Sequence, residues 1–570
     1  METQEIIIEP KVDDVQEFIE IAMDFSNPLD LVREAISNAF DAQAKEILLD
    51  FSVVQIYGEK VLKIQITDNG TGMDLDGLKS FYDLGNSLRR NDEATIGEKG
   101  HGTKVFFNSK KIEVITTRNG KKYCAIMLNP SRELFDRRIP KVTVTTENVE
   151  MQEHGTSITI LGYNNDRREK FTHDQLKDYI LWFTKFGSIE CEFGKEENKD
   201  VKLKFKGVDK KELEELSFGH VFPTESCSVS DLFEKYLVEA PQWYCRKIVR
   251  TGRLKSMPEI EFNAVFCIEG NKIKYGYNNM LRRKGKVAQA GAYTVQERYG
   301  LWLCKDFIPI QRKNEWITSK GSEYTKFHAF VNCQDLRLTA NRGSIDNTPS
   351  EILEDLKKAV QEIYNEIIQG DDWIDLEWLD SEVSAYNTAE KEKKDFKRRI
   401  DRINRTRIAD YNGIRLVEPN LESGVFTIFM QLSTYNPDIF PFVPLDYDTH
   451  SGIDVIVKEN DKSPIKTSKL YYVEFKNYLT KDFNHTFDNL YSIVCWDINL
   501  SEIKNNEEVT DIAKQRRILK IIPPENEGDY TRYYLDYPRG GRKIEIFVLK
   551  SYLKEKLKIE FFPRTEKSSV

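Results

Sequence analysis

Leu31-Val-Arg-Glu-Ala-Ile-Ser-Asn-Ala-Phe-Asp-Ala-Gln-Ala44 is the segment that decides the predicted fold of the N-terminal part of the chain. The segment is rich in Ala, contains Leu and Ile but no Gly or Pro, and follows Asn27-Pro28, so it predicts a helix. At 3.6 residues per turn, Glu34, Asn38 and Asp41 fall on one face, where a core helix would be apolar. A solvated helix surface is the simpler explanation of this segment taken alone, and the neighbouring segments favour a polar site instead.

Two glycine-containing segments follow. Leu62-Lys-Ile-Gln-Ile-Thr67 alternates like a strand and runs into Asp68-Asn-Gly-Thr-Gly-Met73, whose glycines let the backbone approach a flat ligand. A carboxylate at Asp68 could accept a hydrogen bond from an exocyclic amine such as that of adenine. Further on, Gly97-Glu-Lys-Gly-His-Gly-Thr103 offers amide N–H groups that could wrap phosphate oxygens, and it opens an apparent helix.

This order of helix, strand and Gly-rich loop resembles the GHKL ATPase superfamily, which covers gyrase-type topoisomerases, ninety-kilodalton heat-shock chaperones, histidine kinases, MutL and MORC proteins. A fourth element agrees, because His154-Gly-Thr-Ser157 precedes an alternating strand. The resemblance implies a Bergerat-type α/β-sandwich domain that binds ATP and Mg²⁺. In it Glu34 is the general base, Asn38 the magnesium ligand and Asp68 the adenine reader. The other residues that the resemblance places at the nucleotide are Asp41, Gly70, Gly72, Met73, Gly97, Lys99, Gly100, His101, Gly102, Thr103 and Thr156.

The chemistry of these residue types fits that function. Magnesium prefers oxygen ligands and keeps several waters, so one Asn is a sufficient protein ligand beside substrate phosphates. A Glu within one water of the γ-phosphate can orient and deprotonate the nucleophile. None of the seven histidines lies on a convincing helical pair upstream, so phosphoryl transfer to a protein histidine is not expected.

Composition sets further limits. A chain of 570 residues should hold three or four domains, and its net charge of −9 argues against a generally basic nucleic-acid coat. No apolar run approaches a membrane span, and the acidic start does not resemble a signal peptide. The eight cysteines are scattered without a Cys-x-x-Cys pair and are typical of reduced cysteines in a cytoplasmic protein.

The predicted architecture is multidomain α+β. We expect an ATP-binding domain over residues 1–215, an α+β transducer domain over 216–370, a charged helical linker over 371–410 and a restriction-endonuclease-like α/β domain over 411–570. In the transducer domain, strand-like runs at 260–268, 300–303 and 327–332 precede a helix-like segment at 350–368.

One loop of the transducer domain carries a candidate sensor. Asp335-Leu-Arg-Leu-Thr-Ala-Asn-Arg342 resembles the middle-domain loop of the ninety-kilodalton heat-shock chaperones, which implies that Arg342 reaches the γ-phosphate. A cation there could stabilise charge on the transferring phosphoryl group. Gly343 departs from the Glu of those chaperones, and a surface arginine in a turn is the alternative.

The linker is densely charged. Nine Lys and Arg lie between residues 388 and 407 and outnumber the acidic residues, and the absence of Gly and Pro predicts a helix. A solvated helix is the simpler interpretation, and contact with a phosphate backbone is the other. Arg282-Arg-Lys-Gly-Lys286 is a second basic candidate.

The last domain contains a second chemical motif. Gly452-Ile-Asp-Val-Ile-Val457 and Leu470-Tyr-Tyr-Val-Glu-Phe-Lys476 predict two strands joined by a turn. On the second strand, Glu474 and Lys476 share one face, while the apolar residues between and before them face the core. An exposed ion pair is the simplest explanation of Glu-x-Lys on a strand.

The pair of strands resembles the PD-(D/E)xK nuclease core. The resemblance implies that Asp454 and Glu474 hold Mg²⁺ or Mn²⁺ and that Lys476 positions the attacking water, with Glu422 as a further acid from the first helix. The apolar run 490–496 predicts a helix after the second strand.

Three functions remain open at this stage. The first is an ATP-gated homodimeric clamp that controls a DNA nuclease, with bacterial anti-phage defence or DNA repair as its setting and an additional protein partner as an option. The second is a chaperone-like protein-remodelling ATPase. The third is a MORC-like DNA clamp with an inactive nuclease fold. Membrane association is not expected.

Overall fold

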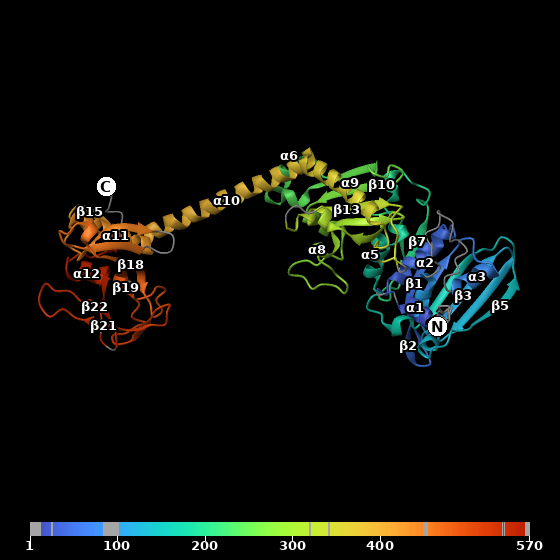
Figure 1. Cartoon of the computed structure of the whole chain (residues 1–570), viewed down its shortest axis with the longest axis horizontal. Coiled ribbons are helices and arrows are strands. Elements are labelled where there is room, and N and C mark those ends of the chain that lie inside the picture. The colour runs from blue at the N-terminus through green and yellow to red at the C-terminus, as the bar shows by residue number, and fades with distance from the viewer. Residues whose placement is uncertain are drawn as a thin grey trace, which may run out of the picture. The chain divides into compact units, whose positions relative to one another are not determined.

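The computed structural model describes residues 13–23, 25, 27–83, 102–317, 321–339, 342–448, 454–488, 490–538, 540 and 542–564. The chain divides into two compact units, Met1–Thr388 and Ala389–Val570 (Figure 1). The division into four domains that the sequence suggests stays a prediction.

An eight-stranded sheet organises the start of the first unit. Its strand order is β5-β4-β3-β6-β2-β1-β7-β8, antiparallel except where β1 pairs with β7. Its strands alternate buried and exposed residues, which buries one face under the helices and gives a two-layer α/β sandwich. The elements are α1 (Asp14–Met23), α2 (Asp30–Asp41), β1 (Glu46–Ile56), β2 (Glu59–Asp68), α3 (Leu75–Tyr82), β3 (Lys111–Arg118), β4 (Lys121–Leu128), α4 (Pro130–Phe135), β5 (Val142–Asn148), β6 (Gly155–Leu161), α5 (His173–Phe183), β7 (Lys202–Lys206) and β8 (Glu214–Ser217).

A five-stranded sheet follows within the same unit, in the order β12-β11-β13-β10-β9. β11 pairs in parallel with β13, and every residue of β13 is buried. The elements are α6 (Val229–Tyr236), β9 (Cys245–Arg253), β10 (Glu261–Glu269), α7 (Asn271–Tyr277), α8 (Val295–Arg298), β11 (Gly300–Lys305), β12 (Ile308–Arg312), β13 (Phe327–Cys333) and α9 (Ser350–Gln369).

Two histidines link α5 and the segment after β8 to β13 in the first unit. His220 Nδ1 lies 3.0 Å from the carbonyl of Leu181 in α5, and its Nε2 lies 3.0 Å from His328 Nε2 on β13. A carbonyl only accepts, so His220 carries its proton on Nδ1 and its Nε2 accepts from His328. His328 Nδ1 in turn lies 2.8 Å from Glu269 Oε1, and both side chains are fully buried. Burial holds the pKa of His220 well below its usual value, so the network keeps this histidine neutral.

The second unit contains an eight-stranded sheet in the order β16-β17-β18-β19-β23-β22-β21-β20 and a small sheet β15-β14-β24. Helix α11 packs on β18 and β19, and α12 packs on β19 and β23. The elements are β14 (Arg407–Tyr411), β15 (Ile414–Val417), α11 (Glu422–Tyr435), β16 (Phe442–Asp448), β17 (Asp454–Glu459), β18 (Leu470–Leu479), β19 (Leu490–Ile498), β20 (Glu508–Thr510), β21 (Arg516–Ile522), β22 (Arg532–Asp536), β23 (Ile544–Val548), α12 (Leu549–Glu555) and β24 (Phe562–Pro563).

The prediction of a helix at 490–496 is wrong, because this run forms strand β19. β19 pairs in parallel with β18 on one side and with β23 on the other. Its residues are buried toward two core clusters, so the strand is apolar on both faces and shows no alternation. Such a continuous apolar run does not distinguish a buried strand from a buried helix.

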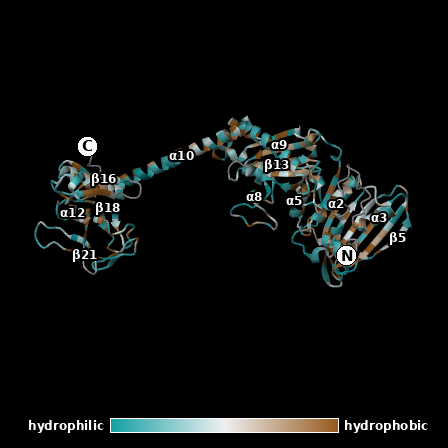
Figure 2. Ribbon diagram, viewed as in Figure 1, coloured by the Kyte–Doolittle hydropathy of each residue, from teal (hydrophilic) through white to brown (hydrophobic). Residues whose placement is uncertain are grey.

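Helix α10 (Asp371–Arg405) covers most of the segment predicted as a helical linker and begins earlier than the charged run. Only Trp373, Leu376 and Leu379 of this helix are buried, and Figure 2 shows the rest of it as mainly hydrophilic. Among the described residues, no helix combines the length and the apolar character that crossing a membrane requires.

Candidate functional site

Helix α2 carries the predicted base and magnesium ligand. Glu34 is buried, with 8% of its surface exposed, and its Oε1 lies 3.7 Å from Arg33 Nε. Asn38 lies one turn later and is half-buried. The end of the helix is joined to the next motif, because the amide of Thr71 donates to the carbonyl of Ala42 over 2.9 Å. The helix therefore presents a carboxylate and an amide beside the loop that follows β2.

That loop begins at Asp68, the last residue of β2. Asp68 Oδ1 accepts a hydrogen bond from the Gly70 amide over 2.9 Å. A Cβ at Gly70 would lie 2.7 Å from the Cβ of Ala42, and one at Gly72, where φ is +67°, would lie 2.0 Å from the carbonyl oxygen of Thr117. Both positions therefore require glycine. Burial raises the pKa of Asp68 to about 6, despite the Gly70 hydrogen bond that lowers it.

Thr156 lies beside Asp68, as the sequence suggested. The two residues are directly paired between β2 and β6. Thr156 Oγ1 lies 3.1 Å from Thr116 Oγ1, and Thr116 accepts a 2.7 Å hydrogen bond from the Met73 amide. Thr116 was missed by the sequence analysis, although a Thr on the buried face of an alternating strand is a usable signal. His154 Nδ1 also holds the loop, through the Gly70 carbonyl at 2.8 Å.

The Gly-rich loop meets the α2 motif at Gly102. A Cβ at Gly102 would lie 1.9 Å from Glu34 Oε2, so the bare backbone rests against the carboxylate. The helix predicted here is a short 3₁₀ helix, Gly102–Phe107, and Thr103 Oγ1 donates to the Phe81 carbonyl over 2.7 Å. The structure thus brings the first and third motifs together. The other predicted loop residues, Gly97, Lys99, Gly100 and His101, lie outside the described residues.

Lys104 is a buried cation that the sequence analysis did not select. Its Nζ donates to the Phe81 carbonyl over 3.1 Å and to Thr103 Oγ1 over 3.0 Å. Burial lowers the pKa of Lys104 to about 7, even though the Asp83 carboxylate opposes this shift. A lysine directly before Val-Phe-Phe is the only local signal. Lys104 therefore anchors the end of the Gly-rich loop to α3.

The candidate sensor Arg342 has a left-handed backbone, with φ at 57°, and donates to Asp306 Oδ2 over 2.8 Å. Asp306 and Phe307 form the turn between β11 and β12. The Asp306 carbonyl lies 3.4 Å from Lys185 Nζ, and the Phe307 carbonyl accepts from the Ile189 amide over 3.2 Å. The Arg342 loop is thereby linked to the segment after α5. The role of Arg342 at the γ-phosphate stays a prediction.

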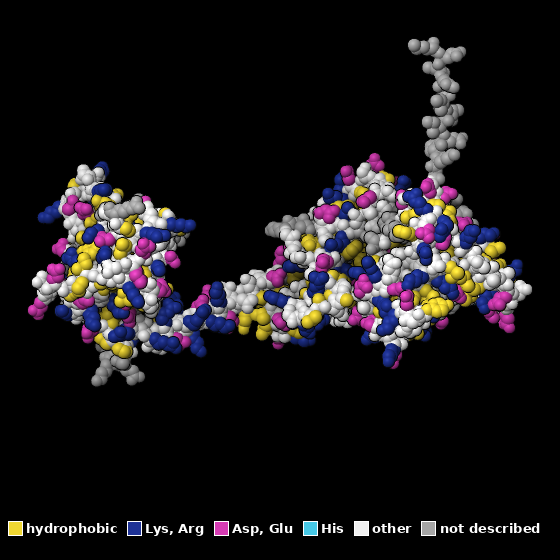
Figure 3. All heavy atoms as spheres, turned by 90° about the horizontal axis from the view of Figure 1, so that it is seen from below, with side chains coloured by type: hydrophobic (Ala, Val, Ile, Leu, Met, Phe, Trp, Pro, Cys, Tyr) yellow, Lys and Arg dark blue, Asp and Glu magenta, His cyan; other side chains and the backbone are white. Residues whose placement is uncertain are grey.

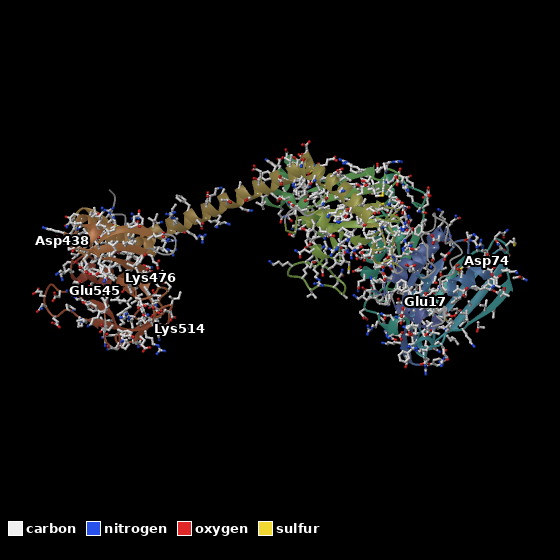
Figure 4. The ribbon with its side chains drawn as sticks, in the orientation of Figure 1. Glu17, Asp74, Asp438, Lys476, Lys514 and Glu545 are labelled. Atoms are coloured by element: carbon white, nitrogen blue, oxygen red, sulfur yellow. The ribbon has the colours of Figure 1, made fainter. Side chains whose placement is uncertain are left out.

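The second motif is assembled in the other unit. Asp454 and Glu474 are directly paired between antiparallel strands β17 and β18, so the backbone places them on one face. Glu474 is fully buried, and Lys476 Nζ lies 2.5 Å from Glu474 Oε1 and 3.3 Å from Glu422 Oε1. Glu422 is the first residue of α11. Lys476 is labelled in Figure 4, and the side chain of Asp454 lies outside the described residues.

His485 extends this cluster and was not predicted. Its Nε2 lies 3.2 Å from Glu474 Oε1, from the connection between β18 and β19. Within the described side chains, no group of three or more His, Cys, Asp or Glu is arranged to hold a metal ion. The donor types nevertheless fit Mg²⁺ or Mn²⁺, since both cations prefer carboxylate oxygens, and Lys476 stands between two of the carboxylates.

Comparison with known proteins relates the N-terminal site to a family of ATPases. Residues 28–156 match a family described as Histidine kinase-, DNA gyrase B-, and HSP90-like ATPase. Among solved structures, the chain is similar to one titled "Crystal Structure of N terminal domain of a DNA repair protein", at 14% identity and a TM-score of 0.34, over 62% of this chain and 98% of that one. No curated protein matches the chain. Residues 28–156, which span α2, the Asp68 loop and Thr156, therefore hold an ATPase domain of the GHKL type.

Proposed function

We propose that the chain is an ATP-driven switch that controls a metal-dependent DNA nuclease. The GHKL-type domain supports binding and hydrolysis of ATP, and such domains commonly work with Mg²⁺ and as dimers. The observation that carries the ATPase proposal is the contact between Gly102 and the Glu34 carboxylate, beside the Asp68 loop. In this site Glu34 would take the proton of the attacking water, Asn38 would hold the cation and Asp68 would accept a hydrogen bond from the adenine amine.

The nuclease proposal rests on the register of β17 and β18. It sets Asp454 opposite Glu474, and Lys476 lies two residues along the same face. Two carboxylates and an ammonium in this order could bind a divalent cation at a scissile phosphate and orient a water. Glu422 and His485 contact the same cluster and would hold Lys476 and Glu474 in place. DNA is the proposed substrate, with anti-phage defence or DNA repair as the setting.

Arg342 would give the nucleotide state a route to the rest of the molecule. Its partner Asp306 belongs to the turn that also contacts Lys185 and Ile189. Movement of the Arg342 loop would therefore shift the segment that follows α5. A homodimeric clamp is the proposed assembly. A chaperone-like ATPase, or a DNA clamp with an inactive nuclease fold, predicts the same ATP turnover without cleavage.

Plasmid cleavage distinguishes these functions. Purified full-length protein is incubated with supercoiled DNA and Mg²⁺ or Mn²⁺, with ATP, with a non-hydrolysable analogue, or without nucleotide. We expect ATP-dependent cleavage that Asp454→Ala and Lys476→Ala abolish and that the exposed control Glu525→Ala retains. Absence of cleavage under every metal condition, or cleavage unchanged in Asp454→Ala, refutes the nuclease. DNA binding without cleavage then supports the inactive clamp.

A further inference from the structure

Helix α10 exposes large apolar side chains along its second half. After Leu379, none of its described residues is buried. Tyr386, Phe396, Ile400 and Ile403 nevertheless leave 46%, 66%, 40% and 48% of their surfaces exposed. Single exposed apolar residues need no explanation, but several on one helix do.

The spacing of these residues is that of a coiled coil. Tyr386, Ala389, Lys393, Phe396, Ile400 and Ile403 follow one another at intervals of three and four residues, and they continue the buried Leu379 by one heptad. A strict alternation of three and four gives a narrow seam with a period of 3.5, whereas a helix lying on a domain has a broader stripe. Lys393 is the one polar interruption, and a single lysine in such a seam is a known determinant of register and partner number.

The charges beside the seam favour a second copy of this chain as the partner of α10. We propose that α10 forms a parallel, in-register coiled coil with a second copy of this chain. In that arrangement Glu392 of one copy faces Lys397 of the other, and the symmetry produces this pair twice. The next equivalent pair joins Arg399 to Asn404, so the positions flanking the seam hold no like-charged pair here, and Lys393 facing its own copy is the one like-charge contact within the seam.

Three basic residues of the helix lie away from the seam. Lys391, Arg398 and Arg405 recur every seven residues at the position opposite the seam. Figure 3 shows Lys and Arg side chains along α10. Pairing through the seam would therefore leave the basic face exposed, because the charged and apolar stripes occupy different sides of the helix.

A groove continues the seam at its C-terminal end. It has a volume of about 410 Å³ and lies between the end of α10 and the β15–α11 connection. Ile403 lines it together with Val417 and Leu421, which are 45% and 58% exposed. The apolar surface that a second helix would cover thus extends past the last heptad.

Sedimentation velocity of the full-length chain without nucleotide tests this pairing. We expect a concentration-dependent species of twice the 66.5 kDa of one chain. The double variant Phe396→Asp, Ile400→Asp should be monomeric at the same concentrations. The matched control Lys391→Asp, Arg398→Asp also introduces two aspartates, but on the opposite face of the helix, and it should remain dimeric.

A charge exchange tests the register. Glu392→Lys alone and Lys397→Glu alone should each weaken the dimer by about threefold to tenfold, since each places like charges across the seam. The double variant should restore the wild-type dissociation constant. A wild-type monomer, a seam variant that still dimerises, or a double variant that stays weak overturns the proposal. A monomer whose DNA binding is lost in Lys391→Asp, Arg398→Asp would assign the helix to phosphate contact instead.

The pairing does not depend on the proposed function. It is measured without nucleotide, DNA or metal, so a chain without nuclease activity could still show it. Conversely, loss of the nucleotide-free dimer would leave ATP hydrolysis to be measured separately. The two outcomes are therefore distinguishable in one set of purified variants.

Discussion

Asp68→Asn tests two effects of the Asp68 carboxylate: its contribution to ATP affinity and its cost to the stability of the folded state. Burial raises the pKa of Asp68 from 3.8 to about 6. The folded state therefore holds this proton more tightly than the unfolded state, and the resulting destabilisation develops as the pH rises from about 4 through about 6. At pH 7.5 the penalty is at most about 3 kcal/mol by the pKa difference, and about 1 to 2 kcal/mol once water at the half-buried group is considered.

The variant should therefore be more stable than the wild type in the absence of nucleotide, by about 1 to 2 kcal/mol at pH 7.5. It should also bind ATP about tenfold or more weakly, because a charged acceptor of the adenine amine is replaced by a neutral one. Urea unfolding at pH 7.5 and at pH 4.5 and calorimetric titration with ATP and Mg²⁺ measure both effects, and the gain in stability should shrink at the lower pH.

Asp74→Asn is the matched control. Asp74, labelled in Figure 4, is exposed and caps α3 by accepting a 2.8 Å hydrogen bond from the Gly77 amide. Asn caps helices about as well as Asp, so this variant should leave stability and ATP affinity close to those of the wild type. If Asp68→Asn destabilises the chain at pH 7.5 while ATP affinity is unchanged, Asp68 neither carries the burial cost nor reads the base.

Three further changes test other parts of the structure. In the wild type, the free energy of unfolding should rise between pH 7 and about 10, because the unfolded lysine keeps its proton over that range while the folded Lys104, with a pKa of about 7, loses it. Lys104→Met should flatten this rise. An unchanged pH profile in urea unfolding contradicts the prediction. Below pH about 6.5 the wild type should lose stability, because the unfolded histidine gains a proton while the folded His220 stays neutral. His220→Gln should remove this loss. If the unfolding free energy of the variant still falls with pH as in the wild type, His220 is not the neutral group. Lys476→Met should destabilise the C-terminal unit by about 3 kcal/mol by leaving the Glu474 carboxylate without its nearest cation, and adding Glu474→Gln should recover most of the loss; denaturant unfolding that shows no recovery rejects the pairing.

Local patterns were sufficient for much of the ATP site. The α2 face, the strand before Asp68 and the glycines at 70 and 72 were predicted because helical spacing, alternation and backbone freedom are properties of short segments. Thr116 and Lys104 were missed because their roles depend on groups from other elements, namely the Met73 amide and the Phe81 carbonyl. Only the fold shows such contacts.

The C-terminal unit shows the same limit more sharply. The sequence predicts Glu474 and Lys476 on one face of a strand, and the structure agrees: their side chains form an ion pair, while Val473 and Phe475 pack into one hydrophobic cluster. The sequence predicts a helix where the structure has strand β19, because both faces of this strand are buried and no alternation remains. His485 gave no signal, since it reaches Glu474 from a connection without regular structure.

ATP turnover by Glu34→Gln tests the proposed switch at its origin. The variant should bind ATP with an affinity close to that of the wild type and hydrolyse it at least about a hundredfold more slowly, since a positioned general base contributes about 10² to 10⁴. The exposed control Glu59→Gln should hydrolyse at the wild-type rate. Full hydrolysis by Glu34→Gln would contradict the assignment of Glu34 as the base.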